Sequence, residues 1–385
     1  MLKVILPATL SVIFSLPGTA GSSRGFAADS IPTAIWYNVT PAGVDLTNSL
    51  DCRNYGTQSA QVDTSHPGTV YTQFMCQGIW KSTDYGQTWT GPINTGTNGA
   101  TVGDCAGGIT VTPTAAAPTI YESCIRGNAV GFWKSTDGGV DWTRYSVVPP
   151  MPSTQDVYPP IVDPYDPMHL LMAAHEQNHL LESTNGGVTW SSIPLNSGML
   201  EHGGTGAIFF INTGSSSTTR TTWLWMAQAS SGTYGTWRTT NGGTSATWIQ
   251  VSTNEHPHGS AQIYQPDTSG IVFIAGQYSA SGDGVLRSTD YGVTWSHISI
   301  ANPETVVTGT PKNIYGMFGF PIGLAGTNNI AFQLDAVPGT GTWNAPGTPT
   351  AMTQGPAQIA VMNDGTHNIL IGAMWNSGLW RYVEP

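Results

Sequence analysis

Short runs of β-branched and aromatic residues recur along the chain, and each follows a turn rich in Pro, Gly or Asn. Strands favour such residue types, whereas Pro, Gly and Asn interrupt strands with turns. The runs are only a few residues long, so the pattern predicts many short strands. Seven copies occur, at Val70-Tyr71, Ile120-Tyr121, Leu170-Leu171, Trp223-Leu224, Val272-Phe273, Ile314-Tyr315 and Ile369-Leu370.

A repeated turn, Ser-x-Asp-x-Gly-x-Thr-Trp, follows five of these runs. It occupies residues 82–89, 135–142, 183–190 and 288–295, and a lengthened variant covers 239–248. Asp or Asn accepts hydrogen bonds from turn N–H groups, and Gly adopts backbone angles closed to other residues. We therefore interpret the third residue of each turn as structural: Asp84, Asp137, Asn185, Asn241 and Asp290.

The two patterns together predict an all-β fold, a single seven-bladed β-propeller with four-stranded antiparallel blades. Each run is strand B of a blade, and the repeated turn joins strands C and D. Six or eight blades remain possible. The last copy has a strand C at Gly378 to Arg381 and no chain left for strand D. Residues Thr33 to Tyr37 can supply it, which would close the ring and remove an exposed sheet edge.

The composition agrees with this fold and limits the classes of partner that the protein can bind. Only 9% of the 385 residues are charged, and the formal net charge is −11. The 12 Lys and Arg residues form no basic patch, so we expect no nucleic-acid partner. We also expect a monomer that needs no cofactor.

The first twenty residues resemble a secretory signal. One cation, Lys3, precedes an apolar stretch and the small residues Gly18-Thr19-Ala20. The prediction is a signal peptide at 1–20, a flexible segment at 21–32 and the propeller at 33–385. A membrane anchor is the alternative for this segment. We expect an extracellular or periplasmic protein without a membrane span after cleavage.

Export makes disulfides the expected state of the four cysteines. Three pairings are possible. In the repeat alignment Cys52 and Cys105 precede strand A, while Cys76 and Cys124 end strand B. The pairing consistent with the repeat is Cys52–Cys76 and Cys105–Cys124.

The repeat also separates two faces. In each blade the A–B and C–D turns lie on one side, and the B–C and D–A loops lie on the other, where propeller ligands usually bind. The pattern places three histidines in A–B turns as solvated residues: His66, His169 and His367. It places five on the opposite side: His175, His179, His202, His256 and His258.

The repeated turns resemble the Asp-box (bacterial neuraminidase repeat) superfamily over nearly the whole chain after the signal. That superfamily includes sialidases, xyloglucan-active glycoside hydrolases and propeller polysaccharide lyases, so the resemblance implies a carbohydrate substrate or ligand. Two departures matter. The chain lacks the Arg-Ile-Pro segment of sialidases, and its B–C loops lack the Thr-Asp-x-Gly-Gly motif of the xyloglucan-active enzymes.

The leading hypothesis is a secreted enzyme that cleaves glycosidic bonds, most simply a glycoside hydrolase with two carboxyl groups. Asp51, Asp104, Asp156, Glu201 and Glu255 form the pool, with Asp156 and Glu201 preferred. The alternative is a polysaccharide lyase in which His202 or His256 moves protons with Tyr158. Predicted substrate-binding residues are Arg53, Tyr55, Arg126, Tyr158 and His258, with Tyr278 and Trp375 as aromatic surface.

Two further interpretations stay open. A non-catalytic propeller that binds a glycan or a protein would show aromatic platforms and no suitable carboxyl pair. A metal site built from histidines is the weaker one, and we predict no metal. Its ligands would be His175, His202, His256 and His258.

Overall fold

The computed structural model describes most of the chain from Thr33 to Pro385, and these residues belong to one compact unit. The described residues are 33–47, 55–114, 116–126, 128–147, 155–175, 177, 179–196, 199, 208–214, 220–227, 235–243, 247–253, 263–275, 285–298, 305–310, 312–318, 331–335 and 347–385. The predicted signal peptide and flexible segment, residues 1–32, lie outside them.

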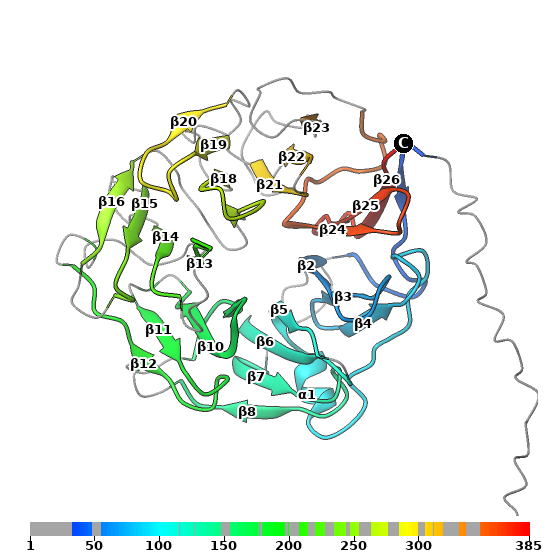
Figure 1. Cartoon of the computed structure of the whole chain (residues 1–385). Coiled ribbons are helices and arrows are strands. Elements are labelled where there is room, and N and C mark those ends of the chain that lie inside the picture. The colour runs from blue at the N-terminus through cyan, green and yellow to red at the C-terminus, as the bar shows by residue number, and fades with distance from the viewer. Residues whose placement is uncertain are drawn as a thin grey trace, which may run out of the picture. The chain divides into compact units, whose positions relative to one another are not determined.

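Antiparallel strands arranged in a ring make up this unit (Figure 1). The strands of the described residues form seven sheets, which we number along the chain. Sheets 1 to 3 consist of β2 Thr57–Val62, β3 Val70–Phe74 and β4 Gly78–Ser82; β5 Ala106–Thr112, β6 Thr119–Arg126, β7 Gly131–Ser135 and β8 Thr143–Tyr145; and β9 Ile161–Asp163, β10 Asp166–Ala173, β11 Leu180–Ser183 and β12 Ser191–Ser192.

The second half of the chain repeats the same order, from an inner to an outer strand. Sheets 4 to 7 consist of β13 Ile208–Phe210, β14 Trp223–Ala227, β15 Gly235–Thr239 and β16 Ile249–Ser252; β17 Ile263–Tyr264, β18 Val272–Ala275, β19 Val285–Ser288 and β20 Ser296–His297; β21 Thr305–Gly309, β22 Ile314–Phe318 and β23 Ala331–Asp335; and β24 Gln358–Asn363, β25 Asn368–Ala373, β26 Leu379–Val383 and β1 Trp36–Asn38.

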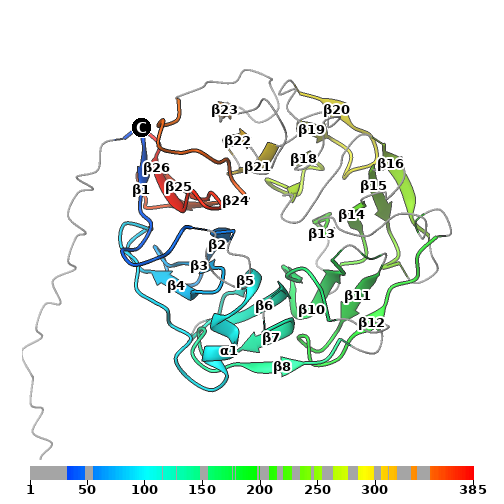
Figure 2. The same ribbon diagram turned by 180° about the vertical axis from the view of Figure 1, so that it is seen from behind.

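The ring closes between the last sheet and the first. The inner strand β24 contacts β2 on one side and β21 on the other, and the view from behind shows the same circular order (Figure 2). The outer strand of sheet 7 comes from the other end of the chain, because β1 pairs antiparallel with β26, with Trp36 opposite Tyr382. The prediction that the segment from Thr33 to Tyr37 supplies the missing strand of the last sheet is therefore confirmed.

Apolar side chains fill the seams between neighbouring sheets. Trp142 and Trp248, the final residues of two repeated turns, are buried. Trp190, which ends a third turn in sheet 3, packs edge-to-face on Phe132 of sheet 2 with ring centroids 5.2 Å apart. Each sheet thus buries its faces against its neighbours, so the core is spread around the ring.

The predicted all-β propeller with four-stranded antiparallel blades is confirmed. Sheets 1 and 6 show only three of the four strands of a blade within the described residues, so the count of seven complete blades stays a prediction. The helix α1, Gly99–Gly103, is a single short turn before β5. Within the described residues we find no helix with the length and apolar character of a membrane span.

Candidate functional site

The repeated turns lie on one side of the ring, which we call the turn face. In each of the five turns the fourth residue donates its N–H to a carbonyl just before the second strand of the same sheet or, in sheet 3, within its first residues. The bonds measure 2.8–3.1 Å and join Tyr85 to Gly68, Gly138 to Pro118, Gly186 to Met168, Gly242 to Thr221, and Tyr291 to Gly270. The A–B and C–D turns therefore share one face, and the B–C and D–A loops form the opposite face.

The carboxylates at the third position of these turns bond within their own turn. Asp84 Oδ1 accepts hydrogen bonds from the Ser82 hydroxyl at 2.7 Å and from the Thr88 N–H at 2.9 Å. Burial raises the pKa of Asp84, but these hydrogen bonds outweigh it and hold the pKa below its usual value. Bonds of this kind leave little acceptor capacity for a substrate.

A central cavity of about 960 Å³ runs between the inner strands. It is lined by apolar residues such as Ile161, Phe210 and Ile263, with amides such as Gln61 and Gln265. No Lys, Arg or His is among its described lining residues. Two carboxylates, Asp163 and Asp267, are among these residues, so the channel is partly apolar and its charged lining is acidic.

Polar contacts connect neighbouring sheets around this channel. Gln358 Oε1 of sheet 7 accepts the Ala60 N–H of sheet 1 at 2.9 Å, and the Thr110 hydroxyl of sheet 2 donates to the Pro160 carbonyl of sheet 3 at 2.6 Å. Between sheets 4 and 5, Gln265 exchanges two hydrogen bonds with the Asn212 backbone. These bonds set the relative positions of the loops that surround the channel.

Asp156, His175 and Tyr158 meet on the opposite face of sheet 3. Asp156 Oδ2 lies 2.9 Å from His175 Nδ1, and the His175 N–H donates to the Asp156 carbonyl at 3.1 Å. Tyr158 packs edge-to-face on the imidazole with centroids 5.2 Å apart, and it also lines the channel. The Asp156 side chain keeps 26% of its surface exposed, whereas that of His175 keeps 6%.

The loop before β9 and the loop after β10 hold this group in place. Val157 forms a bridge with Ala174, and the Tyr158 N–H donates to the Ala173 carbonyl. An imidazole that is oriented by a carboxylate can give or take a proton, as general acid–base catalysis requires. We therefore treat Asp156, His175 and Tyr158 as the candidate site.

The three described cysteines are disulfide-bonded, as the repeat alignment predicts. Cys105 and Cys124 form a disulfide, with Cα atoms 5.3 Å apart. Cys76 is also disulfide-bonded, and its predicted partner Cys52 lies outside the described residues. Beside the first disulfide lies Glu122, a fully buried residue that sequence reasoning missed.

Other predicted residues are less informative. Tyr55 packs partly buried against Met75 and Ala106, and Asp104 accepts a hydrogen bond from Asn128 at 2.5 Å. Trp375, expected on the surface, is buried, and its backbone pairs with Thr57. The structure describes the Arg126 backbone at the end of β6 and not its side chain. Several predicted residues lie outside the described residues: Asp51, Arg53, Glu201, His202, Glu255, His256, His258 and Tyr278.

The prediction that His169 is a solvated turn residue is wrong. It is fully buried in β10, where Nδ1 lies 3.1 Å from Asp163 Oδ2 and Nε2 lies 2.9 Å from Glu182 Oε1. Burial lowers the pKa of His169, but the two carboxylates outweigh it and raise the pKa above its usual value. No signal in the sequence marked this burial, because Asp163 and Glu182 reach His169 only when their strands pair with β10.

Comparison with known proteins gives a fold and no family. No protein-family model matches the sequence, and no curated protein sequence matches it. Among solved structures, the GH74 xyloglucanase from Xanthomonas campestris aligns with a TM-score of 0.62 and 14% identity over 90% of this chain and 53% of its own. The Niastella koreensis GH74 enzyme aligns with a TM-score of 0.54 and 19% identity over 80% of this chain and 46% of its own.

A third likeness belongs to a different kind of protein. YCF48 bound to D1 peptide aligns with a TM-score of 0.54 and 13% identity over 92% of this chain and all of its own length. The present chain spans about half of the length of the two GH74 enzymes. At such low identities, these likenesses show that the chain has a β-propeller fold.

Proposed function

We propose that this protein is a secreted carbohydrate-active enzyme that cleaves glycosidic bonds, most simply as a glycoside hydrolase. The observation that carries the proposal is the Asp156–His175–Tyr158 group, which joins a partly exposed carboxylate to an aromatic ring at the channel. Sugar rings pack on aromatic faces and hydrogen-bond to carboxylates. Tyr158 and Asp156 would supply these two kinds of contact. The likeness to two GH74 structures supports the reaction class.

Asp156 would be one of the two carboxyl groups that glycoside hydrolysis needs. Its Oδ2 faces His175, while Oδ1 is buried and has no hydrogen-bond partner among the described residues. The imidazole would hold the carboxyl group in a fixed orientation. Glu201 is our proposed second carboxyl, because it belongs to the neighbouring repeat on the same face.

The contact between Tyr158 and His175 favours one alternative, a polysaccharide lyase. In that reaction a base removes a proton beside a uronate carboxylate, and an acid protonates the leaving oxygen. Tyr158 and a histidine, His202 or His256, would share these roles, while Arg53 or Arg126 would neutralise the uronate. The channel lining, which lacks cations among its described residues, speaks for the hydrolase.

The remaining features of the proposal concern the whole protein. We propose seven blades, one for each sheet, and an Asp-box origin for the repeated turns. A signal peptide at 1–20 would direct the chain outside the cytoplasm, where its disulfides form. The mature protein would act as a monomer on a glycan.

A panel of polysaccharides tests the proposal on the full mature chain. Release of reducing ends alone identifies a hydrolase, and added ultraviolet absorbance from unsaturated uronates identifies a lyase. Asp156→Asn should lower kcat/KM about 100-fold to 10,000-fold on any active substrate. Asp166→Asn, which changes a carboxylate on the turn face, is the matched control and should keep full activity.

Binding without turnover would contradict the enzyme proposal and favour a non-catalytic module. The likeness to YCF48 bound to D1 peptide makes a peptide ligand part of that outcome. Equal activity of Asp156→Asn and the unchanged protein would remove Asp156 from the site.

A further inference from the structure

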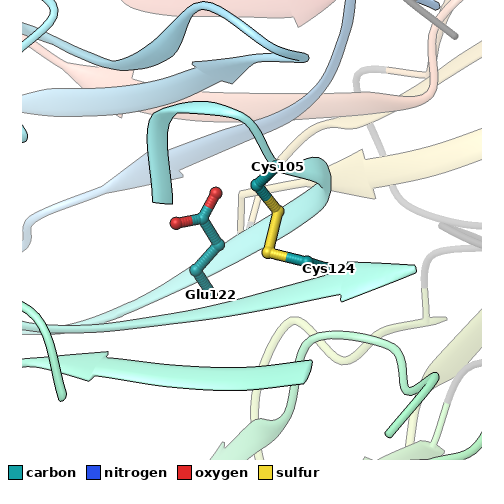
Figure 3. A group of neighbouring side chains, drawn as sticks. All are labelled: Cys105, Glu122 and Cys124. Carbon is teal, nitrogen blue, oxygen red and sulfur yellow. A yellow bond between two sulfur atoms is a disulfide. The ribbon is translucent and has the colours of Figure 1, made fainter. Parts of the chain in front are cut away.

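Cys105, Glu122 and Cys124 lie next to one another inside sheet 2 (Figure 3). Glu122 and Cys124 are two residues apart on β6, so their side chains leave the same face of the strand. Cys105 immediately precedes β5, the partner of β6, and its sulfur completes the group. One oxygen of Glu122 and the two sulfur atoms lie within 4.8 Å of one another.

The carboxyl group of Glu122 is buried and only half satisfied. Its Oε1 accepts a hydrogen bond from Gln73 Nε2 at 2.6 Å. Its Oε2 has no hydrogen-bond partner among the described residues, and neither does Gln73 Oε1. All three potential ligands are fully buried. A buried, unpartnered oxygen is rare in folded proteins and calls for an explanation, because it costs free energy without return.

We propose that Cys105, Cys124 and Glu122 form a Zn²⁺ site when their disulfide is reduced. Two thiolates and a carboxylate are ligands that Zn²⁺ accepts in a tetrahedral arrangement. The thiolates select Zn²⁺ over Mg²⁺ and Ca²⁺, which prefer oxygen ligands. The side-chain oxygen of Gln73, Oε1, or a water molecule would take the fourth position.

Opening the Cys105–Cys124 disulfide requires an added reductant. A trialkylphosphine cleaves the sulfur–sulfur bond and is oxidised to its phosphine oxide, with water supplying the oxygen and the two thiol protons. Zn²⁺ then displaces both thiol protons, and any proton on the Glu122 carboxyl, into the buffer. No oxidation state changes in this second step. The reduced pair is also the state of the chain before its cysteines are oxidised.

The experiment uses the full mature chain with Cys52→Ser and Cys76→Ser, so that the remaining cysteines are the proposed ligands. After reduction with a phosphine, Co²⁺ is added as a spectroscopic probe, and Zn²⁺ then competes for the site. We expect one equivalent of Co²⁺ with thiolate-to-metal absorption, displaced by one equivalent of Zn²⁺. The oxidised protein should show neither signal.

Glu122→Gln is the decisive variant, since it keeps the shape of the side chain and removes the carboxylate. It should weaken Zn²⁺ binding about 10-fold to 100-fold, while Cys105→Ser with Cys124→Ser should abolish it. Far-ultraviolet circular dichroism of each reduced sample shows whether the sheets persist. Unchanged affinity in Glu122→Gln would overturn the proposal, and so would binding that appears only in unfolded protein.

Discussion

Asp290 illustrates how one side chain holds a repeated turn together. Its Oδ1 accepts the Ser288 hydroxyl and the Thr294 N–H, and its Oδ2 accepts the Thr294 hydroxyl at 2.6 Å. Burial raises the pKa of Asp290, but the hydrogen bonds from Thr294 and Ser288 outweigh it and lower the pKa to about 2. The folded state therefore favours the ionised carboxyl group.

Asp290→Ala should lower the free energy of unfolding at neutral pH by about 1–2 kcal/mol, because several turn N–H and O–H donors lose their acceptor. The folded pKa lies below the ordinary 3.8, so this stabilisation is complete above the ordinary pKa and fades as the pH falls toward about 2. Urea unfolding at a series of pH values measures both effects.

Asp290→Asn is the matched control, since Asn185 and Asn241 occupy this position in two native turns. It should cost less than Asp290→Ala and remove the part of the pH dependence that Asp290 supplies. If the alanine variant were as stable as the unchanged protein, the turn would not depend on its carboxylate.

A cation at the next-to-last position of a third strand joins two pairs of neighbouring sheets. Arg238 Nε of sheet 4 donates to the Tyr291 carbonyl in the repeated turn of sheet 5 at 2.9 Å. Lys134 of sheet 2 bonds in the same way to Gly186 of sheet 3. In sheet 3 the corresponding residue is Glu182, and it binds His169 within its own sheet. The charged side chain at this strand position is therefore satisfied either by a carbonyl of the next sheet, when it is a cation, or by a histidine of its own sheet, when it is Glu182.

Arg238→Met should lower the free energy of unfolding by about 1.5–3 kcal/mol, since it removes a charge-assisted hydrogen bond and keeps most of the aliphatic stem. Lys81→Met is the control at the same place in sheet 1. Lys81 lies over the Tyr71 ring, with Nζ 5.3 Å from the centroid, and its loss should cost about 1 kcal/mol or less. Thermal and urea unfolding compare the two variants, and equal losses would contradict the proposed role of the inter-sheet bond.

The whole ring depends on a contact between the two ends of the described chain. Trp36 on β1 is 3% exposed, and its ring centroid lies 5.3 Å from that of Tyr382 on β26. Without β1, the edge of β26 would present unpaired backbone groups to solvent. Closure therefore converts a row of sheets into one cooperative structure.

Trp36→Ala should lower the free energy of unfolding of the whole protein by about 3–5 kcal/mol, because a large buried ring is lost from the closing strand. Ile35→Ala, at a neighbouring residue that is 46% exposed, should change it by less than about 0.5 kcal/mol. Calorimetry and tryptophan fluorescence measure the two variants. A loss for Trp36→Ala no larger than the control would show that closure contributes little.

Local patterns were enough for much of the fold. Runs such as Val70-Tyr71 became second strands, and the turn residues around Asp84 and Asp290 bond within a few residues of one another. The Cys105–Cys124 pair followed from the repeat alignment, because both residues occupy equivalent ends of neighbouring strands. Such features depend on contacts that are close in sequence or repeated in register.

Contacts between distant segments required the tertiary structure. His169 looked like a turn residue beside Pro167, yet Asp163 and Glu182 surround it once three strands pair. Glu122 gave no signal, because its neighbours Gln73 and Cys105 come from a different sheet and a different strand. Asp156 was chosen from a pool of acidic residues, and its pairing with His175 depends on two loops that meet only in the folded sheet.

Strand propensity and turn chemistry act over a few residues, so the repeated strands and the turn face could be predicted from the sequence. The closing strand followed from the missing fourth strand of the last repeat, although its partner β26 lies at the other end of the chain. Which polar side chains are buried, and which of them meet, emerged from the folded structure, because burial and charge pairing depend on neighbours far apart along the chain.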